Sequence, residues 1–139
     1  MKKSKWAIFL CAAVFLMFSL IPTFAVEQRA SEQLSYYYID VTSSDKMIDT
    51  DFTVRGTKTM DKIGCEGILI YEKSGSRWVS VASFDEDDAD MSVTRMVSHS
   101  NTISWACKSG VEYRVDVTIF AENSAGRDTR SKTVYVTGK

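Results

Sequence analysis

Histidine and proline are nearly absent from this chain of 139 residues. The only histidine is His99, and the only proline is Pro22. His99 lies among polar neighbours, and no serine stands in a G-x-S-x-G context, so the parts of a nucleophilic catalytic site are missing. Two cysteines after residue 25 and one distant histidine do not make a four-ligand zinc site. The sequence therefore predicts no enzyme, no catalytic or metal-binding residue and no cofactor.

Basic charge is not in excess either. The chain has 17 lysines and arginines against 18 aspartates and glutamates. Three of the lysines, Lys2, Lys3 and Lys5, lie at the amino terminus, so the remainder of the chain is mildly acidic. A mildly acidic domain lacks the electrostatic footprint of a nucleic-acid-binding protein. It also lacks the polybasic patch that attracts a protein to an anionic membrane surface.

The one long apolar run, residues 6–18, follows these lysines and has the features of a secretory signal peptide. Pro22 ends any helix that includes the run, because it has no backbone N–H and clashes with the preceding turn. Thr23 and Ala25 then place small residues at the −3 and −1 positions of a cleavage site. The sequence predicts cleavage after Ala25 and a secreted, extracellular chain that begins at Val26.

Three regions follow from this interpretation. They are a signal peptide over residues 1–25, a polar spacer over residues 26–35 and a β-domain over residues 36–139. The alternative is an uncleaved signal anchor over residues 6–25, since about 20 residues span a bilayer. In either case the only expected membrane contact is through this segment.

The two remaining cysteines, Cys65 and Cys107, are candidates for a disulfide. An even number of cysteines in an exported chain favours pairing. A bridge between them would close a long loop and stabilise the fold by about 4 kcal/mol. The alternative is two free buried thiols that behave as small apolar side chains.

After residue 35 the sequence reads as a series of strands with period-2 alternation, separated by turn signals. Regularly spaced short strands predict an all-β fold, a β-sandwich of seven or eight antiparallel strands after the N-terminal signal helix. A closed barrel is the alternative. The expected strands cover residues 37–42, 48–55, 68–71, 78–84, 91–97, 102–106, 112–122 and 129–137, with a turn-rich stretch over residues 56–64.

The alternation is clearest between residues 112 and 122, where Phe120 is the one apolar side chain on the polar side. Residues 110–117, 121–123 and Gly126 resemble the penultimate hairpin of fibronectin type III and related immunoglobulin-like domains. Tyr113 matches the tyrosine whose hydroxyl bonds back to the chain at the corner before that strand. The resemblance implies a single immunoglobulin-like sandwich. The absence of proline after residue 25 departs from the usual fibronectin-type pattern.

A second resemblance covers most of the chain after residue 35. Residues 56–64, 68–72, 78–79 and 113–121 are similar to those of a family of short secreted proteins of Gram-positive anaerobes that carry a domain of unknown function. This resemblance implies location and fold, and it implies no activity.

An acidic loop follows the strand expected at residues 78–84. Asp85, Asp87, Asp88 and Asp90 carry the oxygen ligands that Ca²⁺ prefers. The spacing departs from the calcium-loop pattern, because Ala89 stands where that pattern needs glycine. A solvated turn that protects a sheet edge is the favoured interpretation.

Exposed aromatic residues are the candidates for recognition. Tyr36 and Tyr38 precede and enter the first strand and could stack on a sugar or a partner protein, although ordinary cross-strand packing is the alternative. Trp78 and Trp105 are expected in the core. The sequence predicts a non-catalytic binding module outside the membrane, for an unknown protein or a cell-wall glycan. The alternatives are an accessory subunit of a surface or export assembly and a small secreted enzyme.

Overall fold

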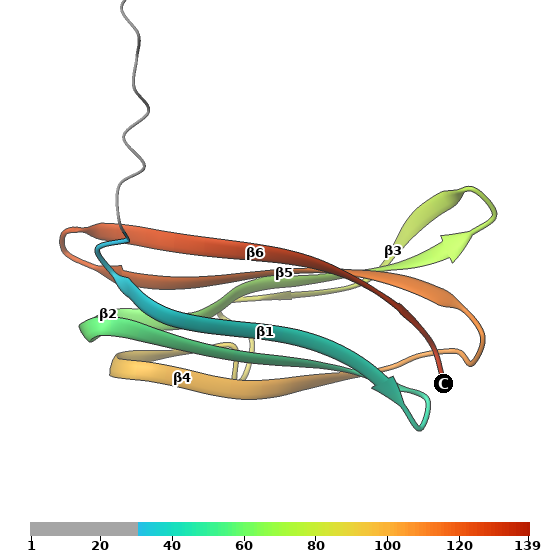
Figure 1. The fold of residues 1–139 in the computed structure, drawn as a ribbon, viewed down its shortest axis with the longest axis horizontal. Helices are drawn as coiled ribbons and strands as arrows, with labels where there is room; N and C mark the ends of the chain where they lie inside the picture. Colours follow the sequence, from blue (N-terminus) through green and yellow to red (C-terminus); the bar gives the residue numbers. More distant parts are fainter. Residues whose placement is uncertain (1–30) are drawn as a thin grey trace, which may run out of the picture.

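The computed structural model describes residues 31–139, which form a curled antiparallel β-sheet (Figure 1). The predicted signal peptide and its cleavage site lie outside the described residues. No helix within residues 31–139 has the length and hydropathy needed to cross a membrane. The strands are β1 (Leu34–Ser44), β2 (Met47–Ser74), β3 (Arg77–Asp85), β4 (Ser92–Ala106), β5 (Glu112–Asn123) and β6 (Gly126–Thr137).

The 28-residue strand β2 organises the sheet, because it pairs with four other strands. Its first part, residues 47–56, pairs with β1 on one side and β4 on the other. Its last part, residues 67–74, pairs with β3 and β5, and β6 completes this side by pairing with β5. We call these the first limb (β1, β4 and residues 47–56) and the second limb (β3, β5, β6 and residues 67–74).

The two limbs meet where β2 bends, at residues 56–64. The pairing of β2 with β4 shifts between Arg55 and Met60, which marks an irregularity in the ladder. Gly64 has a φ of +155°, and a Cβ atom there would lie 2.3 Å from Met91 O. A side chain at Gly64 is therefore excluded both by backbone conformation and by space. Glycine at this position lets the loop before β4 approach the bend.

One apolar core lies between the limbs and draws on both of them. The inward face of β5 alternates as the sequence predicts, and its residues 113, 115, 117, 119 and 121 are fully buried. Phe120 is also fully buried, although it points to the other side of the strand. Its ring is covered by Arg127, whose Cζ lies 3.8 Å from the ring centroid. Further core residues are Ile39, Val41, Ile48, Phe52, Val54, Met60, Ile63, Ile68, Ile70 and Met91.

The all-β class is confirmed, but residues 31–139 contain six strands where the sequence predicts seven or eight. The strands expected at residues 48–55 and 68–71 form the single strand β2, and those expected at residues 91–97 and 102–106 form the single strand β4. Residues 56–64 stay extended inside β2, and residues 99–101 stay in the ladder of β4, where His99 faces Val54. β-Pairing therefore outweighs the local turn signals in both places. β1 begins at Leu34, so the domain starts slightly before the expected residue 36.

The two ends of the molecule are closed by different contacts. At the entry end, where residue 31 lies, Asp128 Oδ2 accepts hydrogen bonds from Ser31 Oγ at 2.6 Å and from Gln33 N at 2.8 Å. Arg127 binds carboxylates at the same end, with Nη1 3.0 Å from Glu122 Oε2 and a further ion pair to Glu86. This end is closed mainly by charged groups.

At the exit end, where Lys139 lies, main-chain hydrogen bonds make most of the closing contacts, with the ion pairs Lys73–Glu112 and Lys108–Glu72 at the surface. Lys46 N donates to Lys139 O at 2.6 Å, and Cys107 N donates to Lys46 O at 2.8 Å. Gly110 N also donates to Gly138 O at 2.8 Å. Backbone hydrogen bonds therefore tie the carboxyl terminus to the turn before β2 and to the loop before β5.

Candidate binding site

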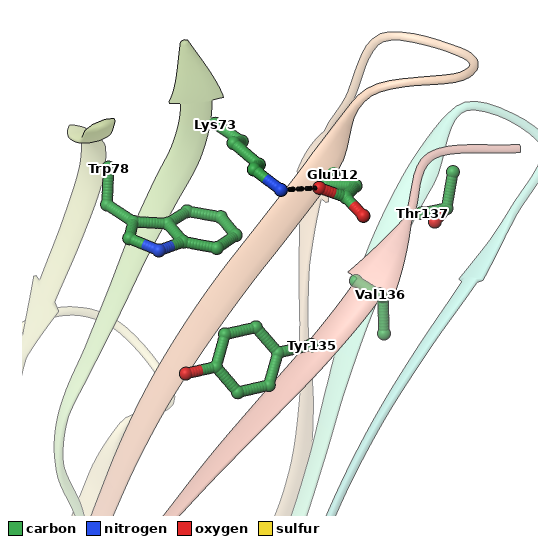
Figure 2. Close-up of a pocket in the computed structure, with 6 residues that line it drawn as sticks. All are labelled: Lys73, Trp78, Glu112, Tyr135, Val136 and Thr137. Atoms are coloured by element: carbon green, nitrogen blue, oxygen red, sulfur yellow. Dashed lines mark hydrogen bonds and ion pairs between the residues drawn. The ribbon is translucent and has the colours of Figure 1, made fainter. Parts of the chain in front are cut away.

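A shallow cleft on the outer face of the second limb, near the exit end, brings together two aromatic rings and a pair of opposite charges (Figure 2). Its volume is about 260 Å³. We call it the aromatic cleft. Its lining residues are Lys73, Trp78, Glu112, Tyr135, Val136 and Thr137.

Strand register explains why these side chains share one face. Lys73 of β2 lies opposite Trp78 of β3, and Glu112 of β5 lies opposite Thr137 of β6. Residues directly opposite each other in an antiparallel pair project to the same side of the sheet. Tyr135 is two residues before Thr137 and therefore projects to that side as well. Four strands, which form the consecutive pairs β2–β3 and β5–β6, thus supply the cleft.

The two rings of the cleft lie close together without stacking flat. The ring centroids of Trp78 and Tyr135 are 5.7 Å apart, and the ring planes are tilted by 53°. Tyr135 is 65% exposed, the highest value among the large apolar and aromatic residues described. Such a tilted pair is a favourable aromatic arrangement that leaves ring surface in contact with solvent.

The charges beside the rings neutralise each other. Lys73 Nζ lies 2.6 Å from Glu112 Oε2, and both side chains are about half exposed. Lys73 Nζ also lies 5.9 Å from the Trp78 ring centroid, within the range of a cation–π contact. Figure 2 shows this ion pair beside the two rings. The cleft therefore offers a hydrogen-bond donor and an acceptor without a net charge.

Next to the cleft, the side chains that lie opposite one another on β2, β5 and β6 are fixed by contacts with each other. Arg114 Cζ lies 4.2 Å from the Tyr71 ring centroid, and Arg114 Nη2 lies 3.0 Å from Asp116 Oδ2. Thr133 Oγ1 donates to Asp116 Oδ1 at 2.7 Å. Since Arg114 faces Tyr135 across β5 and β6, this row supports one side of the cleft.

The predicted recognition residues Tyr36 and Tyr38 lie elsewhere, on the outer face of the first limb. They are 55% and 48% exposed. Their cross-strand neighbours are Arg55 and Thr53, so neither tyrosine faces an aromatic ring on β2. The negative charge of the neighbouring Asp40 raises the pKa of Tyr38. The pair is exposed but is not part of the aromatic cleft.

The rest of that outer face is a ladder of short polar side chains. Ser104 Oγ donates to Asp49 Oδ1 at 2.6 Å, and Ser100 Oγ donates to Thr53 Oγ1 at 2.9 Å. A third bond in the ladder joins Thr102 to Asp51. These groups satisfy one another across β2 and β4.

Tyr113 occupies a structural position. Its hydroxyl accepts a hydrogen bond from Lys108 N at 2.9 Å, five residues upstream, and its ring packs edge-on against Trp105 with centroids 5.7 Å apart. The side chain is fully buried, and burial raises the pKa of the phenol. This contact fixes the loop before β5.

The predicted disulfide between Cys65 and Cys107 is wrong, since both thiols are free and buried. Cys65 lies on β2 near the bend, where its Sγ donates to Thr118 O at 3.2 Å. Cys107 follows β4 at the exit end, and its Sγ lies 3.7 Å from Ser43 Oγ. Register therefore keeps the two thiols apart. Burial raises the pKa of Cys65 to about 12.

The acidic loop is organised by its own backbone. Asp85 Oδ1 accepts a hydrogen bond from Asp87 N at 2.9 Å, and Asp88 Oδ2 accepts one from Asp85 N at 2.8 Å. Asp87 also pairs with Lys62 at 2.8 Å. Within residues 31–139 no group of three or more histidine, cysteine or acidic side chains is arranged to hold a metal ion.

His99, the one histidine, lies within β4 rather than in a loop. A nitrogen of its ring, Nε2, lies 2.8 Å from Asp90 O, and the ring packs against Phe52 with centroids 5.5 Å apart. The contacts of the imidazole are therefore with a main-chain carbonyl and an aromatic ring.

Sequence reasoning missed the aromatic cleft. Trp78 was expected in the core, yet its outward position follows from its register with Lys73. Tyr135 carried a detectable signal, because Val134 and Val136 on either side of it pack against the core. Alternation alone thus places Tyr135 on the outer face, but the meeting of β3 with β6 across two other strands has no local signal.

No family model matches this chain, and no curated protein matches it. Among solved structures it is similar to Spo0M, a sporulation control protein from Bacillus subtilis, with 11% sequence identity and a TM-score of 0.43. The similarity covers 74% of this chain and 49% of the other, so the chain spans about half the length of that protein.

Proposed function

We propose that the protein is an exported, non-catalytic binding module that acts outside the membrane, and that its partner binds at the aromatic cleft. The observation that carries this proposal is the pair of rings, Trp78 and Tyr135, held together on an exposed sheet face. Tryptophan and tyrosine dominate the energy of many recognition surfaces, because they combine a large apolar area with a polar group.

Two further features support the proposal. The amino-terminal segment has the features of a signal peptide, which fits a partner outside the membrane, such as a protein or a cell-wall glycan. The two limbs enclose a single core, which fits the immunoglobulin-like sandwich that the Tyr113 region resembles. Sandwich domains outside cells commonly serve in binding, although that argument rests on analogy of fold.

Co-sedimentation of the purified protein with the insoluble envelope fraction of its producing cells tests the site. We expect saturable binding, and the double variant Trp78→Ala/Tyr135→Ala should weaken it by at least about tenfold, as loss of an aromatic anchor does. The matched control is Tyr36→Ala/Tyr38→Ala on the first limb, which should bind as the wild type does. The opposite pattern would move the site to β1, and no saturable binding by the wild type would refute a binding role at the envelope.

Export is tested by the intact mass of the native protein from culture medium and from membranes. A species in the medium that begins at Val26 would support a secreted domain. The full-length mass confined to the membrane would support an anchor over residues 6–25.

A further inference from the structure

We propose that the aromatic cleft binds a neutral pyranose unit of a polysaccharide chain. The inference rests on the proposed binding function and names its ligand class. A pyranose has an apolar C–H face and a rim of hydroxyl groups, each of which both donates and accepts hydrogen bonds. The cleft offers surfaces that match both parts.

The rings match the apolar face of the sugar. Trp78 and Tyr135 have centroids 5.7 Å apart and planes tilted by 53°, so they cannot both stack flat on one large planar ligand. A puckered pyranose can lie against one ring and contact the edge of the other. The electron-rich faces of indole and phenol attract C–H groups that carry a partial positive charge.

The ion pair matches the hydroxyl rim. Lys73 has three N–H donors and uses one of them on Glu112 Oε2, and the glutamate keeps acceptor capacity on both oxygens. A hydroxyl group can accept from the first and donate to the second. Because the two charges lie 2.6 Å apart and cancel, the cleft has no electrostatic preference for an anion or a cation.

A proline-rich peptide is the main competitor for two exposed aromatic rings. Proline has no N–H, so its residues would give the Glu112 carboxylate no hydrogen-bond donor beyond Lys73. A sugar hydroxyl can use the remaining donors of Lys73 and the remaining acceptor capacity of Glu112, which favours the sugar.

The dimensions favour one sugar ring of a longer chain over a small enclosed molecule. The cleft volume of about 260 Å³ lies below the roughly 300–1,000 Å³ of pockets that enclose a drug-sized ligand. A single shallow contact of this kind gives weak binding, so we expect a dissociation constant of about 0.1–1 mM.

The test is an NMR titration of the ¹⁵N-labelled protein with cellohexaose and with chitohexaose. The two probes share the neutral pyranose chemistry and separate two sources, a plant-type glucan and an amino-sugar chain of the wall type. Saturable shifts of the Trp78 indole N–H and of the residue 112 and 135 amides with either probe are expected. Trp78→Ala should weaken binding by at least about tenfold, and Tyr38→Ala should leave it unchanged. Glu112→Gln, which keeps an acceptor, should weaken binding less than Glu112→Leu.

Decaproline and an oligogalacturonate hexamer are the competing probes. The inference is overturned if neither neutral hexasaccharide shifts the cleft resonances up to about 10 mM, since even a 1 mM site would then be nearly saturated. It is also overturned if decaproline or the anionic sugar binds the cleft more tightly than both neutral sugars. If Trp78→Ala/Tyr135→Ala still abolishes envelope binding in either case, the binding function stands and only the ligand class is wrong.

Discussion

The entry end and the exit end close the same curled sheet by different physical means. At the entry end the carboxylate of Asp128 and the guanidinium of Arg127 make the principal contacts. At the exit end the hydroxyl of Tyr113 and main-chain groups make them, and the ion pairs there, Lys73–Glu112 and Lys108–Glu72, lie at the surface. Ion pairs respond to pH and salt, whereas neutral hydrogen bonds respond only weakly to either. The difference predicts a molecule that loosens from one end first.

The largest effect is expected at the bend near the entry end. Gly64→Ala should lower the free energy of unfolding by about 3 kcal/mol or more, because the new methyl group meets Met91 O and the φ of +155° is strained for alanine. Urea denaturation followed by circular dichroism measures this change.

Gly75→Ala is the matched control. Gly75 also has a positive φ, +62°, but a Cβ atom there has no neighbour within 4 Å. The cost should be about 1 kcal/mol, from backbone conformation alone. Equal losses in the two variants would show that space at the bend is not limiting.

At the exit end, Tyr113→Phe should cost about 1–2 kcal/mol, because it leaves the N–H of Lys108 without its partner. Tyr135→Phe removes the hydroxyl of an exposed ring and should change stability by less than about 0.5 kcal/mol. Thermal unfolding of the two variants makes the comparison. A Tyr113→Phe protein as stable as the wild type would show that this hydrogen bond does not stabilise the exit end.

Acid should act on the entry end. Burial opposes ionisation of Asp128, but hydrogen bonds from Ser31 and Gln33 outweigh it and hold its pKa below the usual 3.8. The contribution of Asp128 to stability is therefore present above pH 3.8 and lost as the pH falls through the lower folded-state pKa. Hydrogen bonds from Arg127 lower the pKa of Glu86 from 4.5 in the same sense.

Unfolding free energies measured between pH 6 and pH 2 test this expectation. Asp128→Asn should reduce the fall in the unfolding free energy at low pH. Ser31→Ala should reduce this fall in part, because the substitution removes one of the donors to Asp128. Hydrogen exchange should show the amides at the entry end losing protection before those at the exit end. Simultaneous loss of amide protection at both ends would contradict the expectation that the entry end opens first.

The smallest effect is expected from reductant. With Cys65 and Cys107 free, dithiothreitol should change the unfolding free energy by less than about 0.5 kcal/mol. A bridge would contribute about 4 kcal/mol. In the native protein Cys65 should resist thiol reagents at pH 8, because burial raises its pKa to about 12. After denaturation both thiols should react.

The sequence predicts the strand type well and the strand number less well. In β5, alternation of apolar and polar side chains identifies the buried face, since only one side can face the core. At residues 56–64, Gly56 and Gly64 look like turn residues, yet they serve a close approach within a continuous strand. Local composition does not distinguish these two uses of glycine.

The candidate site was less accessible to sequence reasoning than the fold. Exposure of Tyr36 and Tyr38 follows from alternation, but the partners of an exposed ring depend on register between distant strands. Trp78 and Tyr135 are 57 positions apart in sequence. They meet because the pairing of β3 with β2, of β2 with β5 and of β5 with β6 brings their strands into one sheet. The same dependence explains the incorrect cysteine pairing.

The hydrogen bonds from Ser31 and Gln33 to Asp128 span 97 and 95 positions of sequence. In a chain that is synthesised from its amino terminus, Ser31 and Gln33 are present long before Asp128, the residue that accepts their hydrogen bonds. The entry end can close only after the β5–β6 hairpin has formed, and such non-local contacts form slowly. Completion of the fold at the entry end is thus deferred until nearly all of the chain has been synthesised.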